Sequence, residues 1–202
     1  GENFVYNNWD FNVAGHLFER LTEQSIYQAL ETQLARPLGF QDWHIENQRK
    51  THNDDVSRYP AYHMYLSTRD MAKLGQLMLN KGEWRGQQLL PATWVERITQ
   101  PTSSREAVQA RYSAPGPFKP DFAYGTMWWL FDALNGDSRY HGAFTASGWG
   151  GQYITVIPKM ELVIAHKVSL NFLQRWGLME GGIGDHTYYR LLDRIVNAKP
   201  AN

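Results

Sequence analysis

Apolar residues recur every three or four positions in the first half of the chain, a spacing that predicts amphipathic helices. The first stripe predicts a helix over residues 11–21 with Asp10 as its N-cap. Its apolar face would consist of Val13, Leu17, Phe18 and Leu21. Ser25-Ile26-Tyr27-Gln28 has the form of a capping box, so a second helix should begin there and stop before Pro37-Leu38-Gly39. Residues 41–63 are polar and weakly periodic, which predicts a loop.

The clearest helical pattern follows a second capping box, Ser67-Thr68-Arg69-Asp70, and Gly82 stands where a C-terminal cap is expected. The apolar stripe of this helix is Met71, Leu74, Leu77 and Met78. Pro91 suits the first turn of another helix, which would continue through Val95 and Ile98.

The second half is rich in β-forming residues. We expect strands over residues 124–131, 152–157 and 162–168, with Pro158–Glu161 as the hairpin turn between the last two. A final helix should begin at Asp185. This order predicts an α+β fold, an antiparallel sheet flanked by helices plus a helical subdomain. Residues 1–120 would form the mostly helical subdomain, and residues 121–202 the strands and the C-terminal helix.

Composition narrows the function. The 20 Lys and Arg residues balance the 20 Asp and Glu residues, so charge gives no reason to expect nucleic acid or an anionic membrane as a partner. The chain has no cysteine, which excludes disulfides, thiolate metal sites and a Cys nucleophile. No apolar run approaches the roughly 18 residues of a membrane span. The seven His residues form no zinc-type spacing and no phosphate-binding glycine loop is present, so we expect no metal and no cofactor.

Two segments carry candidate chemistry. Tyr6 and Asn8 lie just before the first helix, where a Tyr with a lowered pKa can transfer protons and an Asn can bind a substrate carbonyl. Spacing alone favours an ordinary turn, in which the Asn caps the helix and the Tyr packs. Ala146-Ser147-Gly148-Trp149-Gly150-Gly151-Gln152 would open a strand, where backbone N–H groups can bind an oxyanion. A bulged, tightly packed strand is the alternative for this segment.

Taken in order, several motifs resemble the serine β-lactamase and penicillin-binding-protein superfamily, in particular its class C-like branch. The segment Tyr6-Asn7-Asn8 is similar to the Tyr-x-Asn motif of the family, and Ser147-Gly148 to its third motif. Further similar motifs are Pro37-Leu38-Gly39, Ser67 to Gly75, Leu90-Pro91 with Trp94-Val95, and Tyr124-Gly125 with Trp128-Trp129.

The resemblance implies a serine hydrolase that works through an acyl-enzyme. It implies that Tyr6 is the general acid/base and that Asn8 contacts the substrate amide. It also implies that the backbone N–H of Trp149 is an oxyanion donor and that Ser147 and Gly148 contact substrate. The expected partners are a small ester, amide or peptide substrate and an N-terminal half of the same protein.

Two departures from the family pattern shape these expectations. The Ser-x-x-Lys nucleophile motif occurs nowhere in the sequence, so we expect it upstream of Gly1. Without that half, the sheet should have an open edge and the chain should be poorly stable. In the third motif, Ala146 replaces the usual Lys or His cation, which makes efficient β-lactamase activity less favoured. His141 is a candidate to restore that charge.

Other interpretations stay open. The protein could be a non-catalytic binding or scaffold member of the superfamily, or an aromatic carbohydrate-binding module using Trp128, Trp129 and Trp149. Adjacent Trp128 and Trp129 would point to opposite faces of a strand, which disfavours a shared platform. Localisation stays open, although many relatives are exported to the periplasm or beyond.

Overall fold

The computed structural model describes residues 3–112, 117–169 and 183–198. The chain groups into two compact units, residues 5–74 (the hairpin unit) and residues 1–4 with 75–202 (the sheet unit), and each is described by itself. The predicted subdomain boundary after residue 120 stays a prediction.

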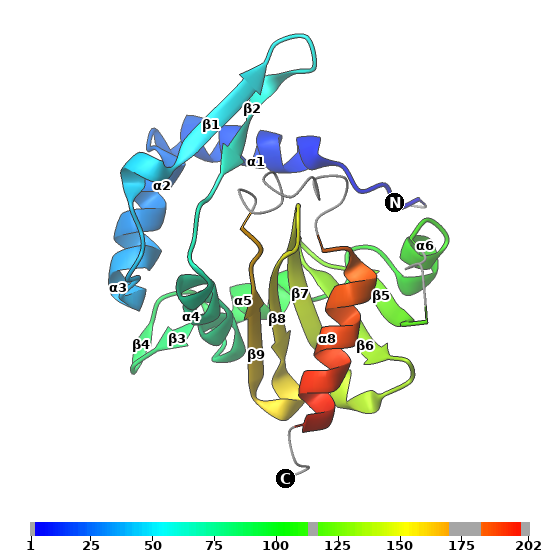
Figure 1. Ribbon diagram of the computed structural model, residues 1–202. Helices are drawn as coiled ribbons and strands as arrows, with labels where there is room; N and C mark the ends of the chain where they lie inside the picture. Colours follow the sequence, from blue (N-terminus) through cyan, green and yellow to red (C-terminus); the bar gives the residue numbers. More distant parts are fainter. Residues whose placement is uncertain (1–2, 113–116, 170–182, 199–202) are drawn as a thin grey trace. The chain divides into compact units, whose positions relative to one another are not determined.

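The hairpin unit combines a helical segment with a two-stranded antiparallel hairpin (Figure 1). Its helical elements are α1 (Asn8–Thr22), α2 (Ile26–Leu30), the π turn η1 (Glu31–Ala35), α3 (Arg36–Leu38), the 3-10 turn η2 (Ile45–Asn47) and the first part of α4 (Thr68–Leu79). Its strands are β1 (Arg49–Asn53) and β2 (Ser57–His63). The predicted loop over residues 41–63 is therefore wrong. All five side chains of β1 are exposed, so this strand has no apolar alternation that could reveal it.

The first helix begins earlier than predicted. Its N-cap is Asn7, whose Oδ1 accepts from the backbone N–H of Trp9 at 2.9 Å, whereas Asp10 lies within the first turn. The predicted apolar stripe is also not the packed face, because Leu17 is 50% and Leu21 81% exposed. The helix instead packs on β2 through Gly15, where an added Cβ would lie 2.4 Å from the Tyr62 ring.

The second helix does not stop before Pro37 as predicted, but runs on to Leu38. The wider π turn η1 comes directly before α3 and accommodates a proline that has no N–H for an ordinary helical hydrogen bond. Gly39, at φ 64°, ends the helix, and the N–H of Phe40 bonds back to the Ala35 carbonyl at 2.8 Å. This is the Schellman form of helix termination.

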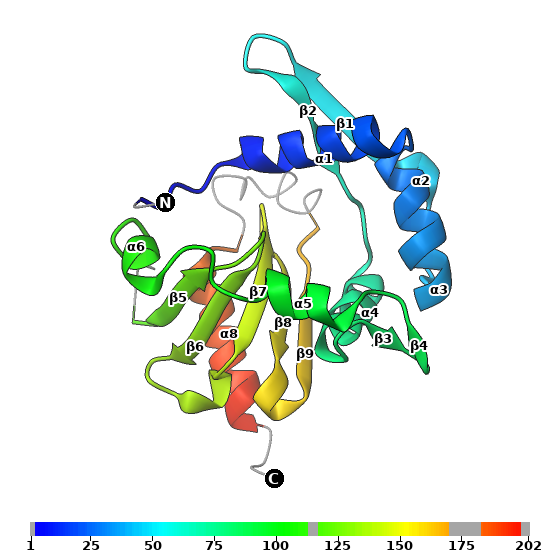
Figure 2. The same ribbon diagram turned by 180° about the vertical axis from the view of Figure 1, so that it is seen from behind.

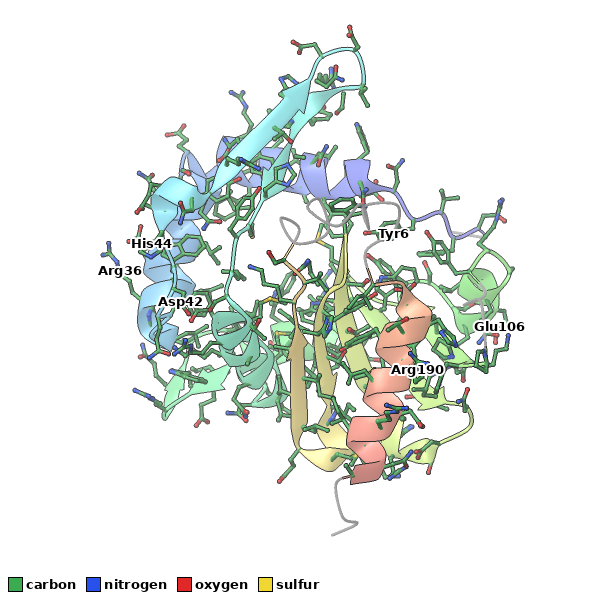
Figure 3. The ribbon with its side chains drawn as sticks, viewed as in Figure 1. Tyr6, Arg36, Asp42, His44, Glu106 and Arg190 are labelled. Atoms are coloured by element: carbon green, nitrogen blue, oxygen red, sulfur yellow. The ribbon has the colours of Figure 1, made fainter. Side chains whose placement is uncertain are left out.

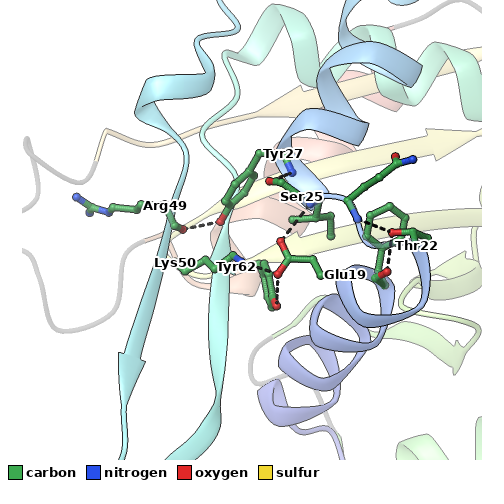
Figure 4. A network of polar contacts seen from close by, with 10 residues as sticks. Glu19, Thr22, Ser25, Tyr27, Arg49, Lys50 and Tyr62 are labelled. Carbon is green, nitrogen blue, oxygen red and sulfur yellow. Dashed lines mark hydrogen bonds and ion pairs between the residues drawn. The ribbon is translucent and has the colours of Figure 1, made fainter.

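A polar network joins α1, α2 and the hairpin around Glu19 (Figure 4). The Glu19 carboxylate accepts from Lys50 Nζ, from the Tyr62 hydroxyl at 3.1 Å and from the backbone N–H of Ile26 at 3.2 Å. Burial and the bond to Glu19 raise the pKa of Tyr62 to about 12, so the phenol stays protonated and donates. Tyr27 adds a bond from its hydroxyl to the Arg49 carbonyl at 2.6 Å.

Ser67 caps α4 as predicted, accepting from the backbone N–H of Asp70 at 3.1 Å. The reciprocal half of the predicted capping box is replaced by a longer-range contact. The fully buried Asp70 carboxylate accepts from the backbone N–H groups of Gln41 and Asp42, at 2.9 and 3.0 Å. Asp70 therefore holds the segment after Gly39 against the first turn of α4.

The sheet unit is built on a five-stranded antiparallel sheet in the order β5-β6-β7-β8-β9. These strands are β5 (Pro120–Tyr124), β6 (Trp129–Leu134), β7 (Ala143–Gly148), β8 (Gln152–Ile157) and β9 (Leu162–His166). The other elements are β3 (Glu83–Trp84), β4 (Gln87–Gln88), α5 (Ala92–Ile98), α6 (Arg105–Gln109), η3 (Ser138–Tyr140), η4 (Pro158–Met160) and α8 (Asp185–Ala198). The predicted α+β fold is confirmed, and β5 and β9 are the outer strands of the described sheet.

Helices cover both faces of this sheet, with α8 on one side and α5 on the other (Figures 1 and 2). On the α5 face, one apolar cluster joins the end of α4 and α5 to the strands. It consists of Met78, Val95, Ile98, Ala123, Leu130, Phe144 and Val156. On the α8 face, Tyr188 and Leu192 are buried, and the Tyr188 ring stacks on Tyr153 with centroids 3.7 Å apart.

Predicted strand 124–131 is in fact a hairpin, because the chain turns between β5 and β6. Gly125 donates its N–H to the Trp128 carbonyl at 2.9 Å, and Met127 adopts a positive φ of 65°. An added Cβ on Gly125 would lie 2.5 Å from the Ile98 carbonyl oxygen, so the turn depends on glycine there. The predicted turn at Pro158–Glu161 and the final helix from Asp185 are confirmed.

Candidate active site

The first group of predicted site residues lies at the start of α1 in the hairpin unit. Tyr6 is partly buried, and its ring lies 5.9 Å from that of Phe11 (Figure 3). Asn8 is the first residue of α1 and is exposed, whereas the capping contact is made by Asn7. The exposed Asn8 side chain therefore does not make the helix-capping hydrogen bond.

The second group lies in the sheet unit, at the turn that joins β7 and β8. Ser147 and Gly148 are the last residues of β7, and Trp149, Gly150 and Gly151 form the turn. The glycine-rich segment thus closes one strand and begins the next, rather than only opening a strand. Gly150 and Gly151 have φ values of 78° and 94°, which other residues rarely adopt. The Trp149 side chain is 70% exposed on this turn.

Strand pairing and a hydrogen bond connect the end of β7 with the last helix through Tyr153. Ser147 and Tyr153 are direct cross-strand partners in the β7–β8 ladder. The Tyr153 hydroxyl lies 2.7 Å from Oδ1 of Asp185, the first residue of α8. Burial, followed by the bond to Asp185, raises the pKa of Tyr153, so this phenol stays protonated.

Neighbouring contacts fix the positions of Tyr153 and of the β7–β8 turn. Tyr188 stacks on Tyr153, and its hydroxyl lies 2.5 Å from Thr155 Oγ1. His166 Nδ1 lies 2.8 Å from the Gly151 carbonyl oxygen, and a carbonyl can only accept, so Nδ1 carries the proton. The β7–β8 turn is thereby attached to β9, and strand β8 is attached to α8.

His141 does not restore a charge at the third motif. It precedes β7, whereas Ser147 and Gly148 end it, and a strand of this length separates them by about 17 Å. Its Nδ1 lies 3.4 Å from Asp132 Oδ1 and its side chain is 73% exposed. The hypothesis that His141 replaces the cation missing at Ala146 is therefore wrong.

The two adjacent tryptophans do not form a common platform, as the sequence indicated. Trp129 contacts the rings of Phe4, Tyr112, Phe122 and Tyr124. Trp128 packs edge-on against Phe144, in the cluster on the α5 face. Each therefore serves the packing of its own face of the sheet.

No group of three or more His, Asp or Glu side chains in residues 3–112, 117–169 and 183–198 could hold a metal ion. Helices in this part of the chain are all too short or too polar to cross a membrane. The candidate residues of the sheet unit are the Ser147 hydroxyl, the Tyr153 phenol and the Asp185 carboxylate.

Comparison with known proteins assigns the fold to a family. The family model described as Beta-lactamase matches residues 1–174. The chain belongs to the beta-lactamase family. Its fold is that of serine β-lactamases and penicillin-binding proteins, so the resemblance drawn from the motifs is confirmed. No curated protein matches the chain.

Solved structures agree with this assignment. A Bacillus anthracis protein, provisionally named a 6-aminohexanoate-dimer hydrolase, has a TM-score of 0.61 at 22% identity over 99% of this chain and 46% of its own. Simvastatin synthase (LovD) from Aspergillus terreus gives 0.60 at 17% identity, over 81% of this chain and 49% of its own. A beta-lactamase from Mycobacterium bovis gives 0.55 at 16% identity, over 81% and 56%. The chain thus spans about half the length of these structures, and at such identities the likeness shows the fold alone.

The sequence patterns did not indicate Tyr153 or Asp185 as candidate site residues. The cross-strand position of Tyr153 follows from the Gly-rich turn once β7 is recognised, because residues placed symmetrically about a hairpin turn become partners. In the sequence, Asp185 is recognisable only as an acidic residue at a helix start. It lies 32 residues from Tyr153, so no local pattern indicates their contact.

Proposed function

We propose that this chain is part of a serine hydrolase that acts through an acyl-enzyme on small ester, amide or peptide substrates. A serine hydroxyl would attack the substrate carbonyl and release the alcohol or amine with a proton, and water would then cleave the enzyme ester to the acid. The observation that carries the proposal is the family match over residues 1–174. The likeness to a protein provisionally named a 6-aminohexanoate-dimer hydrolase and to EstCE1, a hydrolase with promiscuous acyltransferase activity, supports the same class.

The proposed roles follow the family motifs. Tyr6 would transfer the proton between nucleophile and leaving group, and Asn8 would bind the substrate amide. The backbone N–H of Trp149 would stabilise the oxyanion, while Ser147 and Gly148 would contact the substrate. The nucleophile would come from a Ser-x-x-Lys segment outside these 202 residues, because the sequence contains none.

The nature of the third motif favours esters and neutral amides over β-lactams. Ala146 offers no cation for the carboxylate of a penicillin. The name of the Bacillus anthracis neighbour points to linear amides, and that of EstCE1 to acyl transfer. High turnover of penicillins by the complete enzyme would contradict this preference.

A fluorophosphonate probe and intact mass measurement test the proposal. The 202-residue chain, at 23.4 kDa, should gain no adduct, while a longer form carrying Ser-x-x-Lys should gain one. A matched variant of the longer form with that serine changed to alanine should lose the adduct. Labelling of the 202-residue chain alone, or no labelling of an intact Ser-x-x-Lys form, would refute it. The second result would favour a non-catalytic member of the family.

A further inference from the structure

The turn between β7 and β8 carries the proposed oxyanion donor, yet its own residues do little to hold it in one conformation. It consists of Trp149, Gly150 and Gly151, because Gly148 and Gln152 form the last pair of the β7–β8 ladder. Gly150 and Gly151 have positive φ values, and glycine has more backbone freedom than any other residue. The Trp149 side chain is 70% exposed, so packing of the indole does not fix the backbone. The direction of the Trp149 N–H therefore depends on contacts made elsewhere in the turn.

His166, the last residue of β9, supplies such a contact. Its Nδ1 donates to the Gly151 carbonyl oxygen at 2.8 Å, since a carbonyl can only accept. Within residues 3–112, 117–169 and 183–198, no other side chain forms a hydrogen bond with the three residues of the turn. The end of β7 restrains the turn before Trp149, and His166 restrains it two residues after.

The His166 ring is itself held in place. It is partly buried, and His166 pairs with Tyr153 in the β8–β9 ladder. The ring lies 5.6 Å from that of Tyr188 and 6.1 Å from that of Tyr153, measured between centroids. These two tyrosines are buried and stacked on each other. The imidazole therefore presents a preorganised donor to Gly151.

Close packing brings the end of the turn within reach of this donor. A Cβ added to Gly151 would lie 3.1 Å from Val168 Cγ2 and 3.2 Å from Ile183 Cβ. Gln152 donates from Nε2 to the Val168 carbonyl at 3.0 Å, which attaches the start of β8 to the segment after β9. Gly151 is thus fixed by its neighbours, whereas Trp149 is restrained only through the two ends of the turn.

We propose that His166 is a positioning residue that keeps the Trp149 N–H aimed at the oxyanion, acting through its hydrogen bond to the Gly151 carbonyl. This inference rests on the proposed function, because it takes the Trp149 N–H as an oxyanion donor. Complete loss of one such donor lowers kcat roughly 10²–10³-fold. Loss of the anchor leaves the donor present but poorly aimed, so we expect a decrease of about 10–100-fold.

Two variants of nearly equal size separate the hydrogen bond from packing. His166→Asn places an amide N–H near the position of the imidazole Nδ1, whereas His166→Leu has a similar branched shape and no donor. In the complete enzyme, with its Ser-x-x-Lys segment, kcat/KM for p-nitrophenyl acetate should fall about 10–100-fold in His166→Leu and stay within about threefold of wild type in His166→Asn. The fall should lie in kcat with KM nearly unchanged, because the oxyanion is stabilised only in the transition state. The rate of labelling by the fluorophosphonate probe should fall by the same factor.

His141→Leu is the matched control. This histidine precedes β7, at the opposite end of the strand from the turn, and its Nδ1 lies 3.4 Å from Asp132 Oδ1. The control should leave kcat/KM and the labelling rate unchanged. Nitrogen NMR of the complete wild-type enzyme adds a measurement that needs no variant. The neutral His166 imidazole should carry its proton on Nδ1, as the bond to Gly151 requires.

Each outcome decides the matter. Wild-type kcat/KM in His166→Leu, or equal losses in His166→Leu and His166→Asn, would overturn the inference and leave the serine hydrolase proposal intact. A neutral imidazole with its proton on Nε2 would also overturn it, even if His166→Leu did not fold. If p-nitrophenyl acetate is not hydrolysed and the probe does not label the complete enzyme, the proposed function fails, and this inference fails with it.

Discussion

The buried carboxylate of Asp70 allows a sharp test of how the hairpin unit is held together. Asp70→Asn keeps the shape of the side chain but leaves a single oxygen to accept from two backbone N–H groups, those of Gln41 and Asp42. The amide nitrogen would face the other N–H, donor against donor. The variant also removes the negative charge in the first turn of α4. That charge lies 3.7 Å from the Lys73 ammonium and attracts it.

The magnitude follows from these contacts. A hydrogen bond to a charged group contributes roughly 1.5–3 kcal/mol, and a buried donor left without a partner costs about 1–3 kcal/mol. The favourable charge at a helix start adds about 0.3–1 kcal/mol. Because these contributions overlap, we expect Asp70→Asn to destabilise the contact by about 3 kcal/mol.

Amide hydrogen exchange measures this loss directly, because the Gln41 and Asp42 amides are the bonded donors. A loss of about 3 kcal/mol corresponds to exchange roughly a hundredfold faster at both amides. Asp54→Asn is the matched control, since its side chain is 91% exposed and lies 3.5 Å from His52. If Asp70→Asn leaves these two amides as protected as Asp54→Asn does, the conclusion that Asp70 holds the segment after Gly39 against α4 is wrong.

Two further predictions concern the Glu19 network and the packing of α4. Burial raises the pKa of Glu19, but bonds from Lys50, from a backbone N–H and from Tyr62 outweigh it, so the folded pKa lies below the ordinary value of 4.5. Because the folded pKa is lowered, the stabilisation by Glu19 is complete above about pH 4.5 and is lost as pH falls through the folded pKa. Glu19→Gln should therefore flatten the acid side of a plot of unfolding free energy, measured with urea, against pH. An unchanged slope on the acid side would contradict this. Gly75→Ala should cost about 1–3 kcal/mol, because the added Cβ would lie 2.5 Å from Val163 Cγ1. Val163→Ala in the same chain should recover part of that loss in a double-mutant cycle, and strictly additive effects would show that the two side chains do not clash.

Local patterns were sufficient for elements whose signal lies within one helix or turn. The helix α4 was recognisable from Ser67, its apolar stripe and Gly82, because all of these act within a few residues. The final helix α8 and the turn at Pro158–Glu161 are further cases. Six motifs in a consistent order were also enough to indicate the family, although none of them is decisive alone.

Local sequence patterns did not predict the elements that depend on tertiary packing. Polar β1 is a strand because β2 pairs with it, and the two strands were predicted as loop. Helix 26–38 continues through Pro37 because a π turn accommodates it, against the general rule that proline ends a helix. In both cases, the deciding hydrogen bonds follow from tertiary context rather than from local preference.

The candidate site shows the same division. The order of residues places Tyr6, Asn8, Ser147 and an uncharged Ala146 at the family motifs. The surroundings of Ser147 follow from folding alone. Strand pairing brings Tyr153 opposite it, and chain folding brings Asp185 to Tyr153 from 32 residues away. A hydrogen bond has a direction that depends on all its partners at once, and no local sequence pattern specifies partners that meet only when the chain is folded.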